Sequence, residues 1–284
     1  MTKGIRKREM DAVATSAEWS GRMGLEWARQ ASFLDRMMDV VGLPGIEALG
    51  PIDGLSVLDV GCGAGSTSRA LAARGAVVTG VDISEDLLKV AQERNPGITF
   101  VAQDASTFEA QDPFDKLFSR LGMMFFDDPP QALSHLRAQL KPEARAVMVC
   151  WRAMAENPWA HVPVTLVEEV VGPPETLSGP GPGPFAWAGA QSTKALLEAA
   201  GWQEVSFTAR DHILEFFMGD APDPLDRAVA FFSRVGTVAR RLKDMDDPTR
   251  ARAKAHLHEG LHPFVQGDCV QLPGATWVIE ARAH

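Results

Sequence analysis

Short apolar runs alternate along the chain with stretches in which apolar residues recur at helical spacing. The runs have the length of buried strands, and the last of them reads almost wholly apolar, as a strand covered on both faces does. The runs cover residues 57–60, 77–82, 97–101, 115–119 and 144–151. The helical stretches cover residues 66–73, 84–94 and 129–140, with Ser84 and Asp128 as N-cap residues. This alternation predicts an α/β fold with a doubly wound, parallel sheet.

Two later stretches, 152–191 and 219–272, interrupt that alternation. The first contains a run of glycines and prolines, 179–185, that cannot form a regular element. The second predicts two helices, one that starts near Pro224 and one with Pro248 in its first turn. Both insertions are expected to rise over the carboxyl ends of the strands, where open sheets of this kind bind ligands.

The composition fits one soluble domain, because 284 residues with 45% hydrophobic content can bury a single large core. A net charge of −9 opposes binding to nucleic acid, and the one basic stretch, 240–254, is interleaved with acids like a solvated helix face. No apolar run is long enough to span a membrane or to act as a signal peptide. We expect a cytoplasmic location without nucleic-acid or membrane partners, and the oligomeric state is left open.

The three cysteines, Cys62, Cys150 and Cys269, are far apart in the sequence and form no Cys-x-x-Cys pair. This spacing argues against a zinc site, an iron–sulfur cluster and a disulfide framework. Asp127 and Asp128 could suggest a magnesium site, but no third oxygen ligand is placed near them. Asp128 is better explained as the N-cap of the following helix, and we expect no bound metal.

The most informative segment is the glycine-rich turn Val-Leu-Asp-Val-Gly-Cys-Gly-Ala-Gly at residues 57–65. An apolar strand that breaks into alternating glycines turns sharply into a helix and lets a ligand approach the backbone. Asp82 follows at the end of the second apolar run, about 20 residues on, where doubly wound folds bind the two hydroxyls of a ribose. The pair therefore predicts a ligand that contains a ribose.

The spacing in this turn separates two kinds of ligand. A dinucleotide fingerprint needs a third glycine where this chain has Ser66, and Asp59 would repel a bound pyrophosphate. The same carboxylate would attract a cation. Residues 58–65 resemble the first motif of the class I S-adenosylmethionine-dependent methyltransferases, whose cofactor combines an adenosine with a sulfonium and an ammonium group. A dehydrogenase is therefore disfavoured.

The resemblance extends over nearly the whole chain. The segments 119–129, 150–152, 156–159 and 272–277 are similar to a bacterial subgroup of small-molecule methyltransferases, distantly related to the ubiquinone and menaquinone biosynthesis enzymes. It implies a Rossmann-like, seven-stranded, mostly parallel sheet with an antiparallel last strand, to which residues 204–217 and 276–283 would contribute. The domain boundaries are predicted as one methyltransferase domain, 1–284, with cofactor-covering helices in 1–50, a core in 51–151 and substrate-cover insertions in 152–191 and 219–272.

The family's pattern also implies which residues bind. An N-terminal helix with paired tryptophans would close over the cofactor, although these tryptophans could instead only pack the helix onto the core. The predicted cofactor-binding residues are Trp19, Arg22, Trp27, Asp59, Gly61, Cys62, Gly63, Asp82, Ile83, Asp104, Ala105, Ser119 and Arg120. The predicted substrate-binding residues are Met123, Trp159 and Trp187.

Methyl transfer from a sulfonium needs alignment and water exclusion, and a base only if the acceptor arrives protonated. His161 is the candidate catalytic base, with the Asp211–His212 pair and the less favoured His135 as alternatives; the chain has no tyrosine. The predicted function is methylation of a small, largely apolar metabolite, with oxygen favoured over nitrogen or carbon. A non-catalytic S-adenosylmethionine sensor and a macromolecule methyltransferase remain the alternatives.

Overall fold

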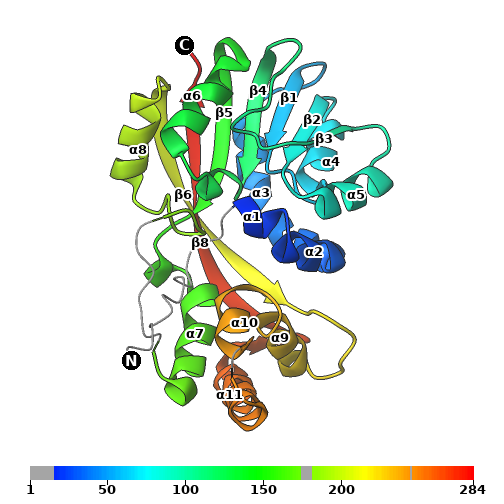
Figure 1. Cartoon of the computed structure of the whole chain (residues 1–284), viewed down its shortest axis with the longest axis vertical. Coiled ribbons are helices and arrows are strands. Elements are labelled where there is room, and N and C mark those ends of the chain that lie inside the picture. Colours follow the sequence, from blue (N-terminus) through cyan, green and yellow to red (C-terminus); the bar gives the residue numbers. More distant parts are fainter. Residues whose placement is uncertain (1–15, 174–180, 244) are drawn as a thin grey trace, which may run out of the picture.

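A computed structural model of the chain describes residues 16–173, 181–243 and 245–284. Its centre is one sheet with the strand order β3-β2-β1-β4-β5-β8-β6, and the short β7 pairs with β8 (Figure 1). The strands are β1 (Ser56–Val60), β2 (Val77–Asp82), β3 (Thr99–Ala102), β4 (Phe114–Arg120), β5 (Leu140–Trp151), β6 (Gln203–Phe216), β7 (Val265–Gln266) and β8 (Cys269–Arg282).

The pairing confirms the predicted doubly wound sheet. β1 to β5 pair in parallel, whereas β8 is antiparallel to both β5 and β6. The predicted antiparallel last strand is therefore confirmed, and β7 is an addition that the sequence did not indicate. β5 begins at Leu140, where the sequence had suggested the end of a helix, and a register shift between Phe114 and Lys116 accompanies this early start.

Four helices pack beside the strands of the core, and two of them begin at the N-caps that the sequence predicts. These helices are α4 (Ser66–Ala72), α5 (Glu85–Arg94), α6 (Pro129–Ala138) and α8 (Ala190–Ala199). Ser84 Oγ accepts a hydrogen bond from the Leu87 N–H at 3.4 Å, and Asp128 Oδ1 accepts one from the Gln131 N–H at 3.1 Å. Both predicted N-caps are confirmed, and Asp128 has a structural role at the start of α6.

Two groups of helices lie beside the carboxyl ends of the parallel strands. The N-terminal group is α1 (Ser16–Trp19), α2 (Arg22–Arg29) and the start of α3 (Ala31–Ala48), which then runs along the sheet and packs against β4, β5, β6 and β8. The second group consists of α7 (Pro158–Val171), α9 (Pro224–Phe232), α10 (Gly236–Lys243) and α11 (Asp247–Gly260), and we call it the helical cover. Figure 1 shows the long β6 and β8 running from the sheet down to this cover.

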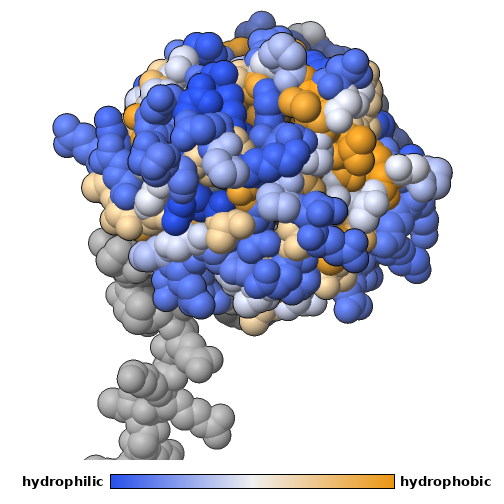
Figure 2. All heavy atoms as spheres, turned by 90° about the horizontal axis from the view of Figure 1, so that it is seen from above, coloured by the Kyte–Doolittle hydropathy of each residue, from blue (hydrophilic) through white to orange (hydrophobic). Residues whose placement is uncertain are grey.

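The two helices predicted for the second insertion are α9 and α11, and α10 is a third helix between them. α7 and α11 pack closely at Gly260, where an added Cβ would lie 2.3 Å from Leu166 Cδ2. Hydrophilic residues dominate the face of the molecule shown in Figure 2, with groups of hydrophobic residues among them. Within the described ranges, no helix has both the length and the apolarity that a membrane crossing requires.

Candidate functional site

The glycine-rich turn after β1 forms the floor of a cavity. Gly61, Gly63 and Gly65 have φ angles of +69°, +54° and +82°, which are left-handed values that favour glycine. An added Cβ at Gly61 would lie 2.9 Å from the Cα of Gly122, whereas one at Gly63 would have no atom within 4 Å. Gly61 is therefore required by the packing of two loops, and Gly63 presents an open face to the cavity.

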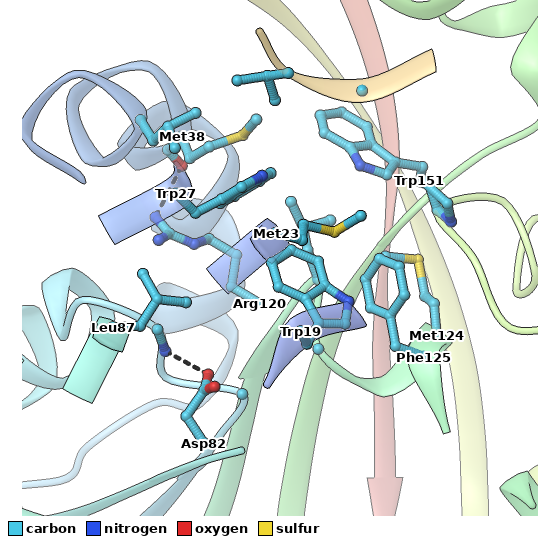
Figure 3. Close-up of a pocket in the computed structure, with 18 of the residues that line it drawn as sticks. Trp19, Met23, Trp27, Met38, Asp82, Leu87, Arg120, Met124, Phe125 and Trp151 are labelled. Atoms are coloured by element: carbon cyan, nitrogen blue, oxygen red, sulfur yellow. Dashed lines mark hydrogen bonds between the residues drawn. The ribbon is translucent and has the colours of Figure 1, made fainter. Parts of the chain in front are cut away.

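Asp82, at the end of β2, is held rigidly beside this turn. Its Oδ2 accepts the N–H of Gly63 at 2.8 Å, and its Oδ1 accepts the N–H of Ser84 at 2.9 Å. Burial raises the pKa of this carboxyl above its ordinary value, and the backbone N–H groups oppose the shift. Each carboxylate oxygen keeps a lone pair that can accept a further hydrogen bond. Figure 3 shows Asp82 at the edge of the cavity.

Asp59 lies beneath the turn and is fully buried. Its Oδ2 accepts hydrogen bonds from Thr67 Oγ1 at 2.7 Å and Ser68 Oγ at 2.6 Å, while its buried Oδ1 has no partner among the described residues. Burial raises its pKa. Asp59 is not among the residues that line the cavity. Its neighbour Val60 does line the cavity, and side chains alternate along a strand.

The N-terminal helices close one side of the cavity with aromatic rings. The Trp19 ring meets those of Trp27 and Phe125 edge to face, with centroids 5.2 and 5.3 Å apart. Met23 and Trp27, one turn apart on α2, turn one face of that helix toward the cavity, and Trp19 joins them from the end of α1. Arg22 is exposed and lies in a neighbouring groove, because it is one position away from that face.

Arg120 enters the cavity from the end of β4 (Figure 3). Its guanidinium donates hydrogen bonds to the Met38 carbonyl at 3.1 Å and to Ser66 Oγ at 2.8 Å. Burial lowers its pKa, opposed first by Asp35. Asp35 also lines the cavity, and burial raises the pKa of its carboxyl despite Arg120 and Arg94. An acidic and a basic side chain therefore lie at the same wall of the cavity.

The opposite end of the cavity is formed by aromatic side chains from the sheet and the cover. The rings of Trp151 and Trp159 lie 4.7 Å apart between centroids, and Phe185 lies 6.3 Å from Trp159. Asn157 is fully buried and positions Trp159, because its Oδ1 accepts both the indole N–H at 2.9 Å and the Ala275 N–H at 2.8 Å. The start of α7 is thereby fixed to β8.

The structure brings most of the predicted residues to this one cavity. The predicted residues that line it are Trp19, Trp27, Gly61, Cys62, Gly63, Asp82, Ile83, Asp104, Ala105, Arg120 and Trp159. Those placed elsewhere are Arg22, Asp59, Ser119, Met123, His161 and Trp187.

Three further predicted residues lie outside the cavity, each for a local reason. Ser119 points the other way from Arg120 along β4, and its Oγ donates to the Val60 carbonyl at 2.8 Å. Met123 is buried in the core beside Met124, which does reach the cavity. Trp187 is 2% exposed in the main core, and its carbonyl accepts a hydrogen bond from Thr193 Oγ1 of α8.

No histidine of the described chain lines the cavity. On α7 the lining residues are Trp159, Ala160, Pro163 and Val164, and His161 falls on another face of the helix. His212 is buried in the sheet with Nε2 2.8 Å from Thr276 Oγ1, and His135 Nε2 lies 2.7 Å from the Phe108 carbonyl. The three candidate histidines therefore lie outside the cavity.

Several lining residues were not predicted from the sequence, although Met23 and Phe125 lie in segments that carry the resemblance. They include Met23, Asp35, Met38, Phe125, Phe231, Phe232 and Arg240. The four-residue spacing of Trp19, Met23 and Trp27 could have identified Met23. Among the described residues, the one group of three possible metal ligands is Asp223, Asp226 and His258 in the cover, not Asp127 and Asp128.

The chain is similar to known methyltransferases. Residues 57–143 match the family described as a methyltransferase domain. The chain is 26% identical to a demethylmenaquinone methyltransferase of Renibacterium salmoninarum over 171 residues, which are 57% of this chain and 72% of the relative. It is 38% identical to a ubiquinone biosynthesis O-methyltransferase of Coxiella burnetii over 112 residues, which are 37% of this chain and 47% of that relative.

Solved structures share the fold at low sequence identity. The YcgJ protein from Bacillus subtilis has a TM-score of 0.55 and 16% identity, over 87% of this chain and 98% of that one. A phosphoethanolamine N-methyltransferase 2 from Haemonchus contortus, solved with S-adenosyl-L-methionine, has a TM-score of 0.50 and 15% identity, over 92% of this chain and 60% of that one.

Proposed function

We propose that this S-adenosylmethionine-dependent methyltransferase transfers its methyl group to an oxygen atom of a small, largely apolar metabolite. The observation that carries the proposal is a single cavity that runs from the glycine-rich turn to the aromatic wall of Trp151 and Trp159. The lining at the aromatic end is mostly apolar, as in sites that bury small organic ligands. The name of the Coxiella burnetii relative, an O-methyltransferase, supports oxygen as the acceptor atom.

The residues at the other end fit S-adenosylmethionine. Asp82 presents a fixed carboxylate with free lone pairs, which suits two ribose hydroxyls. Gly63 leaves open space above the turn for the body of the ligand. Asp104 and Ala105 line the cavity after β3 and are suited to an adenine, and Arg120 and Asp35 offer opposite charges to the carboxylate and ammonium of the methionine part.

The cofactor supplies a methyl group that is already activated on a sulfonium. The protein has to align an acceptor with that methyl and exclude water, effects worth on the order of 7–11 kcal/mol in well-oriented systems. Trp19 and Trp27 close the cavity over the cofactor end, and Trp159 and Trp151 confine the acceptor. Trp19 Nε1 is buried without a partner among the described residues and can donate to a bound ligand.

The described part of the chain supplies no histidine base at the cavity. We therefore propose that the acceptor loses its proton to water before transfer, as a phenol, an enol or an acid of suitable pKa does. The rate should then follow the ionisation of the acceptor. Free thiols at Cys62, Cys150 and Cys269 are consistent with the cytoplasmic location that we propose.

Titration calorimetry tests the cofactor, and labelled methyl transfer tests the reaction. The full-length protein should bind S-adenosylhomocysteine and bind NAD much more weakly. Incubation of a bacterial extract with methyl-labelled S-adenosylmethionine should label a compound of low molecular mass. Label in protein or nucleic acid alone would favour a macromolecule methyltransferase, and binding without any labelled product would favour a sensor.

A further inference from the structure

A second groove opens beside the cavity, between the N-terminal helices α1 and α2 and the cover helices α10 and α11. Its lining carries seven cationic side chains and two acidic ones, Glu18 and Glu26, in a protein whose net charge is −9. The cations are Arg22, Arg29, Arg234, Arg240, Lys243, Arg250 and Lys254. Positive charge is therefore concentrated at one place on an acidic molecule.

Most of these cations lack an acidic partner. Arg29 lies 3.7 Å from Glu26, and Arg250 pairs with Asp247 at 2.6 Å. The other five form no ion pair with any residue in the described ranges. Ser233 Oγ also lines the groove, and it is buried without a hydrogen-bond partner in the same part of the chain. Unpaired donors that converge on a hollow favour an anionic ligand.

The groove is continuous with the methyl-transfer cavity. Met23, Trp27, Val235, Gly236 and Arg240 line both hollows. Arg240 is half-buried at this junction, and the one hydrogen bond that it donates within the described residues is to Thr237 Oγ1 at 3.3 Å, one turn earlier on α10. Beyond Arg240, the cavity wall supplied by the cover is apolar, with Phe231, Phe232 and Val238.

We propose that the methyl acceptor carries an anionic group, a carboxylate or a phosphate, which the basic groove holds while the apolar part occupies the cavity. The inference rests on the proposed function, since it names the class of that acceptor. A small acidic molecule suits the site better than a polyanion, because Glu18 and Glu26 interrupt the basic lining and the groove leads into an enclosed apolar space. The predicted solvated face, 240–254, thus becomes a binding surface.

Two fluorescent probes of matched shape test the charge requirement. 8-Anilinonaphthalene-1-sulfonate is anionic, and N-phenyl-1-naphthylamine is its neutral counterpart. Both are titrated into full-length protein saturated with S-adenosylhomocysteine, which blocks the cofactor end. Wild type should bind the anion about tenfold more tightly, a ratio expected for one charge-assisted hydrogen bond. Salt should weaken binding of the anion and leave the neutral probe unchanged.

Three variants locate the binding. Arg240→Gln should lower the affinity for the anionic probe about tenfold and leave the affinity for the neutral probe within about twofold of wild type. Trp159→Ala should weaken both probes, because it removes the apolar wall. The control is Arg252→Gln, an exposed arginine on α11 that does not line the groove, and it should change neither.

Other outcomes overturn the proposal. Equal affinity for the two probes in wild type, or an unchanged anion affinity in Arg240→Gln, means that the groove does not select charge. Micromolar binding of transfer RNA or of phosphatidylglycerol vesicles that displaces the anionic probe means that the groove serves a polyanion or a membrane. Calorimetry separates the two proposals. Failure of S-adenosylhomocysteine binding overturns the proposed function. Normal cofactor binding without charge selection overturns only the proposal that the groove binds an anionic group.

Discussion

Asp82 receives its two backbone N–H donors, from Gly63 and Ser84, on different oxygens, so its carboxylate keeps one orientation before any ligand arrives. Gly63 links the two motifs that the sequence had identified separately. Its N–H is bound by Asp82, and its open side faces the cavity. The strand-end acid and the glycine-rich turn therefore act as one preformed unit.

Replacing Asp82 should weaken cofactor binding and change little else. In the proposed binding mode, Asp82→Ala removes charge-assisted hydrogen bonds to two hydroxyls, each worth about 1.5–3 kcal/mol. We expect S-adenosylhomocysteine to bind at least about tenfold more weakly by calorimetry. Asp86→Ala, an exposed acid on α5, is the matched control. Wild-type affinity in Asp82→Ala would show that the ribose lies elsewhere.

The glycines of the turn should separate binding from folding. Gly61 and Gly63 both have positive φ, so valine at either position carries similar backbone strain, about 1–2 kcal/mol. Gly63→Val places its Cβ in open space, with no atom within 4 Å, and should abolish S-adenosylhomocysteine binding with a melting temperature lowered by a few degrees. Gly61→Val meets the backbone of Gly122 and should be much less stable. Equal loss of stability in both would give Gly63 a structural role.

Among the elements, the strands and the core helices followed from the sequence because their periodicity and caps are local signals. Asp59 and Ser119 do not line the cavity, as strand alternation relative to Val60 and Arg120 could have indicated. The sequence could not show which face of α7 points into the cavity, because Asn157 sets this orientation through its hydrogen bond with Ala275 on the distant β8. A long-range hydrogen bond leaves no pattern in the sequence around a helix.

The orientation of α7 allows a direct test of whether His161 acts as a base. Trp159→Ala removes a wall of the cavity and should lower the affinity for N-phenyl-1-naphthylamine about tenfold. His161→Ala should leave that affinity, and the turnover of an identified acceptor, within about twofold across the pH range. A loss of turnover of about 10²–10⁴ in His161→Ala that shrinks as the pH rises would instead restore the general-base role.

At the scale of the whole molecule, three acidic side chains are buried around the cofactor end of the cavity, and their ionisation lowers the stability of the fold. Asp35, Asp59 and Asp82 are brought together from α3, β1 and β2, and burial raises the pKa of each. A raised pKa means that the folded state binds the proton more tightly than the unfolded chain, so these acids cost stability as the pH rises past 3.8 through the folded value. The sequence showed each acid, but only the fold shows that they share one buried region.

Asp59→Asn should therefore make the protein more stable at neutral pH. The amide can keep its oxygen toward Thr67 and Ser68, which both donate to Oδ2, and can place its NH₂ where Oδ1 has no partner among the described residues. The change removes a buried charge, and each kcal/mol gained should raise the melting temperature by about 2–4 °C.

The pH dependence distinguishes this cause from a change in packing. The advantage of Asp59→Asn over wild type should be largest near pH 7 and shrink as the pH falls, because the wild-type carboxyl then takes up its proton. Melting curves at several pH values, with Asp86→Asn as the exposed control, measure the difference. A variant that is less stable at every pH, or an advantage that does not change with pH, would contradict a cost of ionisation at Asp59. Weaker S-adenosylhomocysteine binding by the stabilised variant would show that the buried charge supports the cofactor from beneath the turn, without touching the cavity.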